Sequence, residues 1–141
     1  MTFYVDSCIY LNLWKREERG KVKFWKLAEN FFERVEKTHD TIYVSSFVLK
    51  ELCFAHDVSN LQQKIDNIRN SQLFKGVSAG SNDYSEARRF ESVAQFEISF
   101  FDCMHIALAK RIGAILVTRD KKLLNFAREL CLVSKPEDIQ I

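Results

Sequence analysis

The sequence predicts an α/β domain in which helices cover both faces of a parallel sheet. Short apolar runs alternate with longer helical patterns along the 141 residues, and strands that are apolar on both sides are typical of a buried parallel sheet. Hydrophobic residues make up 47% of the chain, which is enough for one core. Residues 1–141 are therefore expected to form a single domain.

Each expected element follows from its local pattern. Residues 2–5 (TFYV) are a short apolar strand, and the stretch after Asp6 continues as a helix up to Gly20. Residues 21–40 place apolar side chains on one face of an amphipathic helix. The later elements are, in order, a strand at 41–45, helices at 46–56 and 57–71, a short strand within 72–79, a helix from the 78–83 loop to about 97, a helix at 102–112 that stops at Gly113, a strand at 114–118, a helix at 121–130 and a strand at 131–134.

The first residues, the cysteines and the net charge narrow the class of protein. Charges interrupt the first 20 residues too early for a signal peptide or a membrane span, so we expect a cytoplasmic protein without a membrane partner. The four cysteines have no CxxC spacing and are interpreted as reduced core thiols. A net charge of +2 indicates a polyanionic partner only if the basic residues cluster.

Acidic residues stand where apolar segments begin or end. Asp6 follows the strand at 2–5 and Asp120 follows the strand at 114–118, and ligands of open parallel sheets bind beyond the carboxyl ends of the strands. Asp102 opens a helix, and Glu51 lies in the first turns of another. All four carboxylates can therefore point toward one rim of the sheet.

Helix capping is the alternative explanation for three of these acids. An aspartate before a helix commonly accepts hydrogen bonds from free backbone N–H groups, and Asp6, Asp102 and Asp120 all have that position. Glu51 lies inside a helix and has no such role. Four clustered carboxylates would repel one another, and a hard cation such as Mg²⁺ or Mn²⁺, which prefers oxygen ligands and serves phosphodiester hydrolysis, removes that repulsion.

Three blocks of the sequence together resemble a known family. They are VDSCIYL (5–11), SSFVLKEL (45–52) and FFDCMHIALAKRIGAILVTRD (100–120), and they resemble the PIN domain. The PIN domain is a metal-dependent ribonuclease fold that includes the VapC toxins of toxin–antitoxin pairs. The last block is the most specific, with D-x-x-H-I-A-x-A, a glycine and an apolar strand closing on T-R-D. The resemblance covers almost the whole chain in order.

The resemblance implies a fold and a site. The fold would be a three-layer sandwich with a five-stranded parallel sheet in the order 3-2-1-4-5 and helices on both faces. The implied catalytic and metal-binding residues, for Mg²⁺ or Mn²⁺, are Asp6, Glu51, Asp102 and Asp120, and the implied supporting residues are Ser7 and Thr118. Some members carry a further acid just after the last aspartate, whereas this chain has Lys121 and Lys122. The number of metal ions therefore stays open.

The implied function is metal-dependent endonucleolytic cleavage of RNA by a VapC-like toxin. An antitoxin of the VapB kind would then place a basic side chain or helix in the acidic cleft. The cations expected to bind the RNA backbone are Arg16, Lys50, Arg119 and Lys121, although a solvated helix face explains basic residues equally well. Trp14 and Trp25, taken as exposed aromatics, predict a homodimer.

Other functions stay open at this point. The same fold can serve as a non-catalytic module that binds RNA or protein, or as a solitary RNA-processing nuclease without an antitoxin. A phosphatase-like hydrolase with an aspartyl nucleophile would need a second aspartate two residues after Asp6, where the chain has Cys8. His105 lies three positions after Asp102 on the same helix face, but a histidine among apolar residues is more commonly a core residue.

Overall fold

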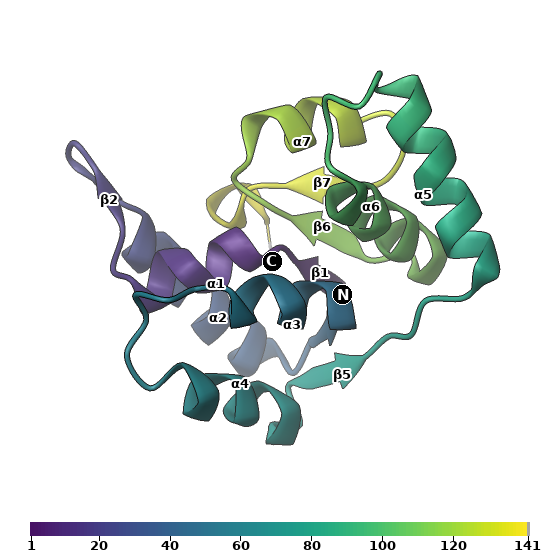
Figure 1. The fold of residues 1–141 in the computed structure, drawn as a ribbon. Helices are drawn as coiled ribbons and strands as arrows, with labels where there is room; N and C mark the ends of the chain where they lie inside the picture. The colour runs from purple at the N-terminus through teal and green to yellow at the C-terminus, as the bar shows by residue number, and fades with distance from the viewer. Residues whose placement is uncertain (141) are drawn as a thin grey trace.

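A five-stranded parallel sheet forms the centre of the protein. The computed structural model describes residues 1–140, and its sheet has the order β5-β4-β1-β6-β7 (Figure 1). The strands are β1 (Thr2–Val5), β4 (Thr41–Val44), β5 (Phe74–Gly76), β6 (Ile115–Val117) and β7 (Val133–Ser134). When the strands of this sheet are counted among themselves, the order is 3-2-1-4-5. The predicted fold class and the predicted topology are confirmed.

Helices lie on both faces of the sheet. From β1 the chain moves through β4 to β5, and it then crosses back to β6 and β7. Because crossovers between parallel strands are right-handed, this reversal divides the helices between the two faces. The helices are α1 (Ser7–Trp14), α2 (Phe24–Thr38), α3 (Ser46–Cys53), α4 (Leu61–Asn70), α5 (Ser81–Val93), α6 (Phe100–Ile112) and α7 (Lys121–Ala127), followed by a 3₁₀ turn (Pro136–Asp138).

The core lies where the two helical layers meet the sheet. Phe3, Tyr4 and Val5 of β1 are fully buried, as expected for the middle strand of a covered sheet. Helix α6 packs against the sheet with an unbroken buried stretch from Cys103 to Ala109. All four cysteines are free thiols, but Cys53 is exposed, so its assignment to the core was wrong.

The first predicted helix is shorter than expected. Helix α1 ends at Trp14, and the polar stretch after it forms an antiparallel hairpin of β2 (Glu18–Arg19) and β3 (Val22–Lys23). Gly20 has a φ of 63° in the two-residue turn, a conformation that favours glycine. Both strands are exposed and the hairpin stands away from the body of the protein (Figure 1). Its charged residues cannot bury a helix face, which explains the difference.

Helix α6 begins two residues before the predicted start. Ser99 occupies the N-cap position, and its hydroxyl accepts a hydrogen bond from the backbone N–H of Asp102 at 3.1 Å. Asp102 therefore lies in the first turn rather than at the cap.

Among residues 1–140, the structure shows no helix with the length and apolar character needed to cross a membrane.

Candidate functional site

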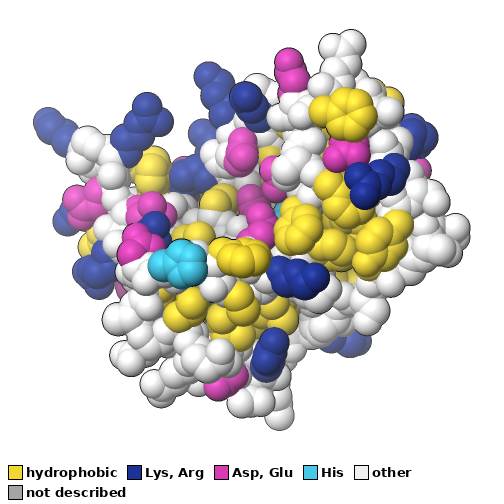
Figure 2. Space-filling model, viewed as in Figure 1, with side chains coloured by type: hydrophobic (Ala, Val, Ile, Leu, Met, Phe, Trp, Pro, Cys, Tyr) yellow, Lys and Arg dark blue, Asp and Glu magenta, His cyan; other side chains and the backbone are white. Residues whose placement is uncertain are grey.

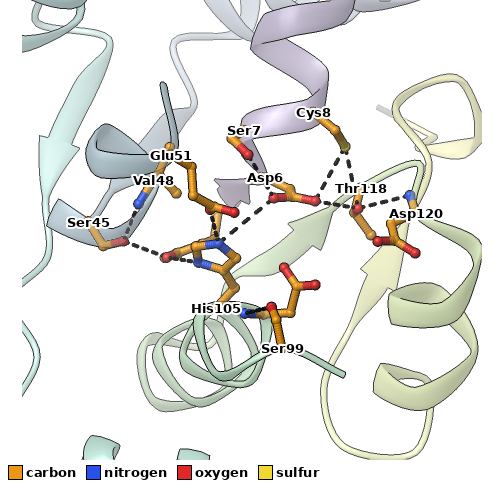
Figure 3. Close-up of polar contacts among 12 residues, drawn as sticks. Asp6, Ser7, Cys8, Ser45, Val48, Glu51, Ser99, His105, Thr118 and Asp120 are labelled. Carbon is orange, nitrogen blue, oxygen red and sulfur yellow. Dashed lines mark hydrogen bonds and ion pairs between the residues drawn. The ribbon is translucent and has the colours of Figure 1, made fainter. Parts of the chain in front are cut away.

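Asp6 lies at the carboxyl end of the central strand β1, directly beside β6. The side chain is buried, with 4% of the residue exposed. Its Oδ2 accepts a hydrogen bond from Thr118 Oγ1 at 2.7 Å, and Cys8 Sγ lies 3.3 Å from the same oxygen (Figure 3). Ser7 Oγ is 3.5 Å from Oδ1. Asp6 occupies the N-cap position of α1 but makes no side-chain cap hydrogen bond, so its carboxylate is directed into the site instead.

Glu51 reaches the same site from helix α3, where it meets His105 of α6. Glu51 Oε1 lies 2.5 Å from His105 Nε2, and His105 Nε2 lies 3.8 Å from Asp6 Oδ1. The glutamate is half-buried and the imidazole is fully buried. A glutamate in the middle of a mostly apolar helix therefore has a specific partner, and that partner comes from a different layer of the fold.

Asp102 completes a compact group of carboxylates. The backbone N–H of Asp102, in the first turn of α6, donates to the hydroxyl of the N-cap residue Ser99. The carboxylate of Asp102 therefore has no capping role. Burial, followed by the negative charge of Asp6, raises the pKa of Asp102 to about 7. Glu51 and Asp120 add to that rise, while His105 opposes it. The raised pKa therefore reflects burial first and the nearby carboxylates second.

Asp120 lies at the rim of this group rather than within it. Its Oδ1 accepts hydrogen bonds from the backbone N–H groups of Lys122 at 3.0 Å and Leu123 at 3.3 Å, so it caps helix α7. Its own N–H donates to Thr118 Oγ1 at 3.2 Å. Thr118 thus connects the exposed aspartate of the rim to the buried Asp6, and the capping interpretation holds for this one acid.

His105 is the residue whose place in the site the sequence did not indicate. Its Nδ1 lies 2.6 Å from the hydroxyl of Tyr4, so both ring nitrogens have partners. Burial lowers the pKa of His105, but the hydrogen bond that Glu51 accepts from the ring and the charges of Asp6, Glu51 and Asp102 together raise it above its ordinary value. Burial also raises the pKa of Tyr4 far above its usual range. The D-x-x-H spacing was the available signal, because it places His105 and Asp102 on one helix face.

The donor set fits a hard divalent cation. One ligand atom each from Asp6, Glu51, Asp102 and His105 lies within 4.8 Å of the others. Carboxylate oxygens dominate the group, as Mg²⁺ and Mn²⁺ prefer. His105 only partly offsets the negative charge that adds to the pKa of Asp102, and a cation would balance the rest. Three of the four predicted acids are therefore brought together, with the fourth at the rim.

Comparison with known proteins identifies the family. The sequence profile of the PIN domain matches residues 3–129. The chain belongs to the PIN domain family. No curated relative matches this PIN domain.

Solved structures share the fold of this PIN domain at low sequence identity. VapBC2 from Rickettsia felis, bound to a DNA fragment from its promoter, is 19% identical with a TM-score of 0.69, over 96% of this chain and 98% of that chain. FitAB bound to the IR36 DNA fragment is 14% identical with a TM-score of 0.66, over 100% and 99%. FitAcB from Neisseria gonorrhoeae is 15% identical with a TM-score of 0.66, over 99% and 100%. At these identities the likeness concerns the fold.

The cations predicted to contact phosphate have different surroundings in this PIN domain. Lys50, Lys121 and Arg16 are exposed, and the guanidinium of Arg16 lies 4.0 Å from the centre of the Trp25 ring. Arg119 is instead largely buried and pairs with Glu137 through two contacts of 2.8 Å. The side chain predicted as the best phosphate contact is therefore engaged within the protein.

The aromatic side chains predicted to form a dimer surface are also not exposed. Trp14 and Trp25 are both partly buried, and Trp25 Nε1 donates a hydrogen bond to Glu18 at 3.1 Å. Their description as exposed aromatics was wrong, because Trp14 packs against Tyr10 with ring centres 5.8 Å apart and Arg16 lies over the ring of Trp25. The large apolar side chains that do face solvent include Phe54, Tyr84 and Phe96.

Proposed function

We propose that this PIN domain is a metal-dependent endoribonuclease and the toxin of a toxin–antitoxin pair. The observation that carries the proposal is the convergence of Asp6, Glu51 and Asp102 at the carboxyl end of the central strand. Membership of the PIN family supports nuclease chemistry. The structural neighbours VapBC2 and FitAB support the toxin assignment, since they share the fold over nearly their whole chains.

In this proposal, Asp6, Glu51 and Asp102 hold Mg²⁺ or Mn²⁺, and Asp120 contributes its charge from the rim. When bound, such a cation activates water and offsets the charge that develops on the phosphate oxygens. Thr118 keeps the Asp6 carboxylate in place through their 2.7 Å hydrogen bond. Because that bond occupies Oδ2, the side chain cannot rotate freely out of the site.

Glu51 and Asp120 are the two candidates for the residue that accepts a proton from the attacking water. Each has one carboxylate oxygen engaged, Glu51 Oε1 with His105 and Asp120 Oδ1 with the backbone of α7. Within residues 1–140 the second oxygen of each makes no hydrogen bond. Only an oxygen that does not bind the metal ion is able to take the proton.

The hairpin after α1 is the best candidate for gripping the RNA backbone. Its exposed cations include Arg19, Lys21 and Lys23. Figure 2 shows acidic side chains in a hollow near the centre of this face, with lysine and arginine side chains around it. Cations that flank an acidic centre can hold the phosphates on either side of the bond to be cut. The exposed Lys50 and Lys121 stay proposed contacts.

Arg119 fastens this hairpin to the site. Its guanidinium lies 4.4 Å from the centre of the ring of Phe24, the first residue after β3. Its Nε donates to Asn12 Oδ1 at 3.3 Å, and Asn12 Nδ2 donates to Glu17 Oε1 at 3.1 Å. Phe24 and Glu17 flank the two ends of the hairpin, so both ends are connected to Arg119, which precedes Asp120 in the chain. Arg119 is then an anchor for the hairpin rather than a phosphate contact.

The proposed partners are an antitoxin and a second copy of the chain. A basic side chain from a VapB-like antitoxin would balance the same carboxylates that a metal ion balances, and so would compete with catalysis. Phe54 and Tyr84 are the exposed aromatics available for a homodimer. A small neighbouring reading frame with a DNA-binding N-terminal segment would support the pair, and its absence would favour a solitary nuclease.

Cleavage of end-labelled structured RNA tests the proposal. The parent protein is expected to cut with Mn²⁺ or Mg²⁺, and the cutting should disappear with EDTA and in Asp6→Asn purified identically. Cutting that persists in the variant would reveal a contaminating nuclease. Failure of the parent to cut any RNA, although it binds Mn²⁺, would favour the non-catalytic binding module instead.

A further inference from the structure

A chain of buried hydrogen bonds runs behind the carboxylates. Ser45 Oγ lies 2.6 Å from the hydroxyl of Tyr4, and the same hydroxyl lies 2.6 Å from His105 Nδ1. On its other side the ring meets Glu51, with Nε2 and Oε1 at 2.5 Å (Figure 3). Ser45, Tyr4 and His105 are each at most 1% exposed, so solvent does not compete for these contacts.

The chain joins the three elements that carry the carboxylates. Tyr4 belongs to β1, two residues before Asp6. Ser45 is the N-cap of α3, where its hydroxyl accepts a hydrogen bond from the backbone N–H of Val48, and α3 carries Glu51. His105 belongs to α6, one turn after Asp102. Each member of the chain therefore sits on an element that also supplies an acid to the cluster.

Both ring nitrogens of His105 are already in use. Nε2 forms a hydrogen bond with Glu51 at 2.5 Å, and this contact engages the nitrogen whichever of the two groups holds the proton. Nδ1 is similarly engaged with the Tyr4 hydroxyl. A histidine that ligates a metal must offer one free lone pair. Here that would require breaking a short buried hydrogen bond.

We propose that His105 is a positioning residue and not a metal ligand. It holds Glu51 in the cluster, and Tyr4 with Ser45 fixes the ring from behind. The inference rests on the proposed metal-dependent function, but it concerns His105, Tyr4 and Ser45, to which that function assigns no role. One consequence is a ligand set made of oxygens alone, which favours Mg²⁺ and Mn²⁺ over Zn²⁺.

The Tyr4 hydroxyl can be removed with almost no change in the shape of the side chain, and a second buried tyrosine of the protein is a matched control. Tyr10 is also buried, but its hydroxyl has no hydrogen-bond partner among residues 1–140. Tyr4→Phe is expected to weaken Mn²⁺ binding by about tenfold and to lower kcat while the KM for RNA stays unchanged. Tyr10→Phe should alter neither. Equal Mn²⁺ affinity in Tyr4→Phe and the parent would overturn the proposal.

Substitution of His105 separates the two roles without relying on Tyr4. His105→Gln keeps an N–H donor that can reach Glu51, whereas His105→Leu removes it. A positioning role predicts that Gln restores most of the Mn²⁺ affinity lost in Leu. If both variants lose Mn²⁺ binding equally while the parent prefers Zn²⁺, His105 is a ligand and the proposal fails.

Nitrogen NMR of the imidazole gives a readout that needs no RNA. The His105 Nε2 resonance is expected to keep the chemical shift of a hydrogen-bonded nitrogen when Mg²⁺ is added to the parent protein, since the ring keeps its bond to Glu51. A change of that resonance to the shift of a metal-bound nitrogen would overturn the proposal. A parent that binds Mn²⁺ but cuts no RNA would contradict the nuclease function alone, whereas a parent that binds no Mn²⁺ would contradict both.

Discussion

Asp6 and Asp120 have the same setting in the chain and different uses in the fold. Each follows a parallel strand and occupies the N-cap position of the next helix. Asp120 is exposed and caps α7 with its side chain, whereas Asp6 is buried and bonds to Thr118 without capping α1. The difference comes from the neighbours, because β1 is the central strand and is flanked by helices that bring two further acids. A position after a strand therefore makes an acid a candidate metal ligand, and burial beside other carboxylates distinguishes Asp6 from Asp120.

The same contrast extends to the cations of the two regions. Around the buried cluster no lysine or arginine of residues 1–140 pairs with Asp6, Glu51 or Asp102. At the rim, Arg119 pairs with Glu137 and supports the hairpin. At the centre, three carboxylates have only His105 to offset their negative charge, and the periphery supplies positive charge. This separation suits a site that binds a metal ion at its centre and a polyanion around it.

Removing the charge of the hairpin sharpens this contrast most strongly. The triple variant Arg19→Gln, Lys21→Gln, Lys23→Gln is expected to raise the KM for RNA by about tenfold and to reduce the salt dependence of binding, with kcat unchanged. The matched control is Lys37→Gln, Arg69→Gln, Arg128→Gln, which removes equal charge from exposed residues outside the hairpin. Steady-state cleavage at several salt concentrations is the measurement. Equal effects in the two triples would reduce the hairpin to a solvated surface.

Substitution of Asp102 is expected to have a smaller effect, which concerns the stability of the metal-free protein. Its pKa rises from 3.8 to about 7 in the folded protein, so ionisation opposes folding progressively as pH rises from about 4 to 7, and the whole penalty is present above 7. Asp102→Asn is expected to stabilise the metal-free protein at pH 8 by roughly 1 kcal/mol after allowance for partial exposure, or about 2–4 °C in Tm. At pH 4 the two proteins should melt alike.

Thermal melts with and without Mn²⁺ check this expectation. Saturating Mn²⁺ should stabilise the parent and leave Asp102→Asn nearly unchanged, because the cation relieves the repulsion that the substitution removes. A lower Tm for Asp102→Asn at pH 8 would instead show that the carboxylate stabilises the first turn of α6.

Local patterns were sufficient for the fold class and for three of the acids. The strands that carry the site are apolar throughout, and the acids follow them or open helices, so the pattern made Asp6, Glu51 and Asp102 candidates, while the resemblance to the PIN domain supplied the strand order and the metal-binding role. The hairpin was missed because its polar residues have a strong helix propensity, and only the turn at Gly20 opposes it. A helix in that stretch would have no apolar face to pack against the protein, and a short helix is not stable without such packing.

Contacts between distant residues explain what the sequence could not predict. His105 acquires its role from Tyr4 and Glu51, which are 101 and 54 residues away in the chain. Arg119, predicted as a phosphate contact, has Glu137 and Asn12 as partners within the protein. Neither relation leaves a periodic trace, because each depends on how separate layers pack. Site residues that act through such contacts require the tertiary structure.

Mn²⁺ titration of the RNA-free protein tests the central claim most directly. Isothermal calorimetry would compare the parent with Asp6→Asn and Asp120→Asn, and asparagine retains the capping ability of aspartate at position 120. We predict that Asp6→Asn abolishes Mn²⁺ binding and that Asp120→Asn weakens it only by a few fold. Equal loss in both variants, or undiminished binding in Asp6→Asn, would contradict a metal site centred on the buried carboxylates.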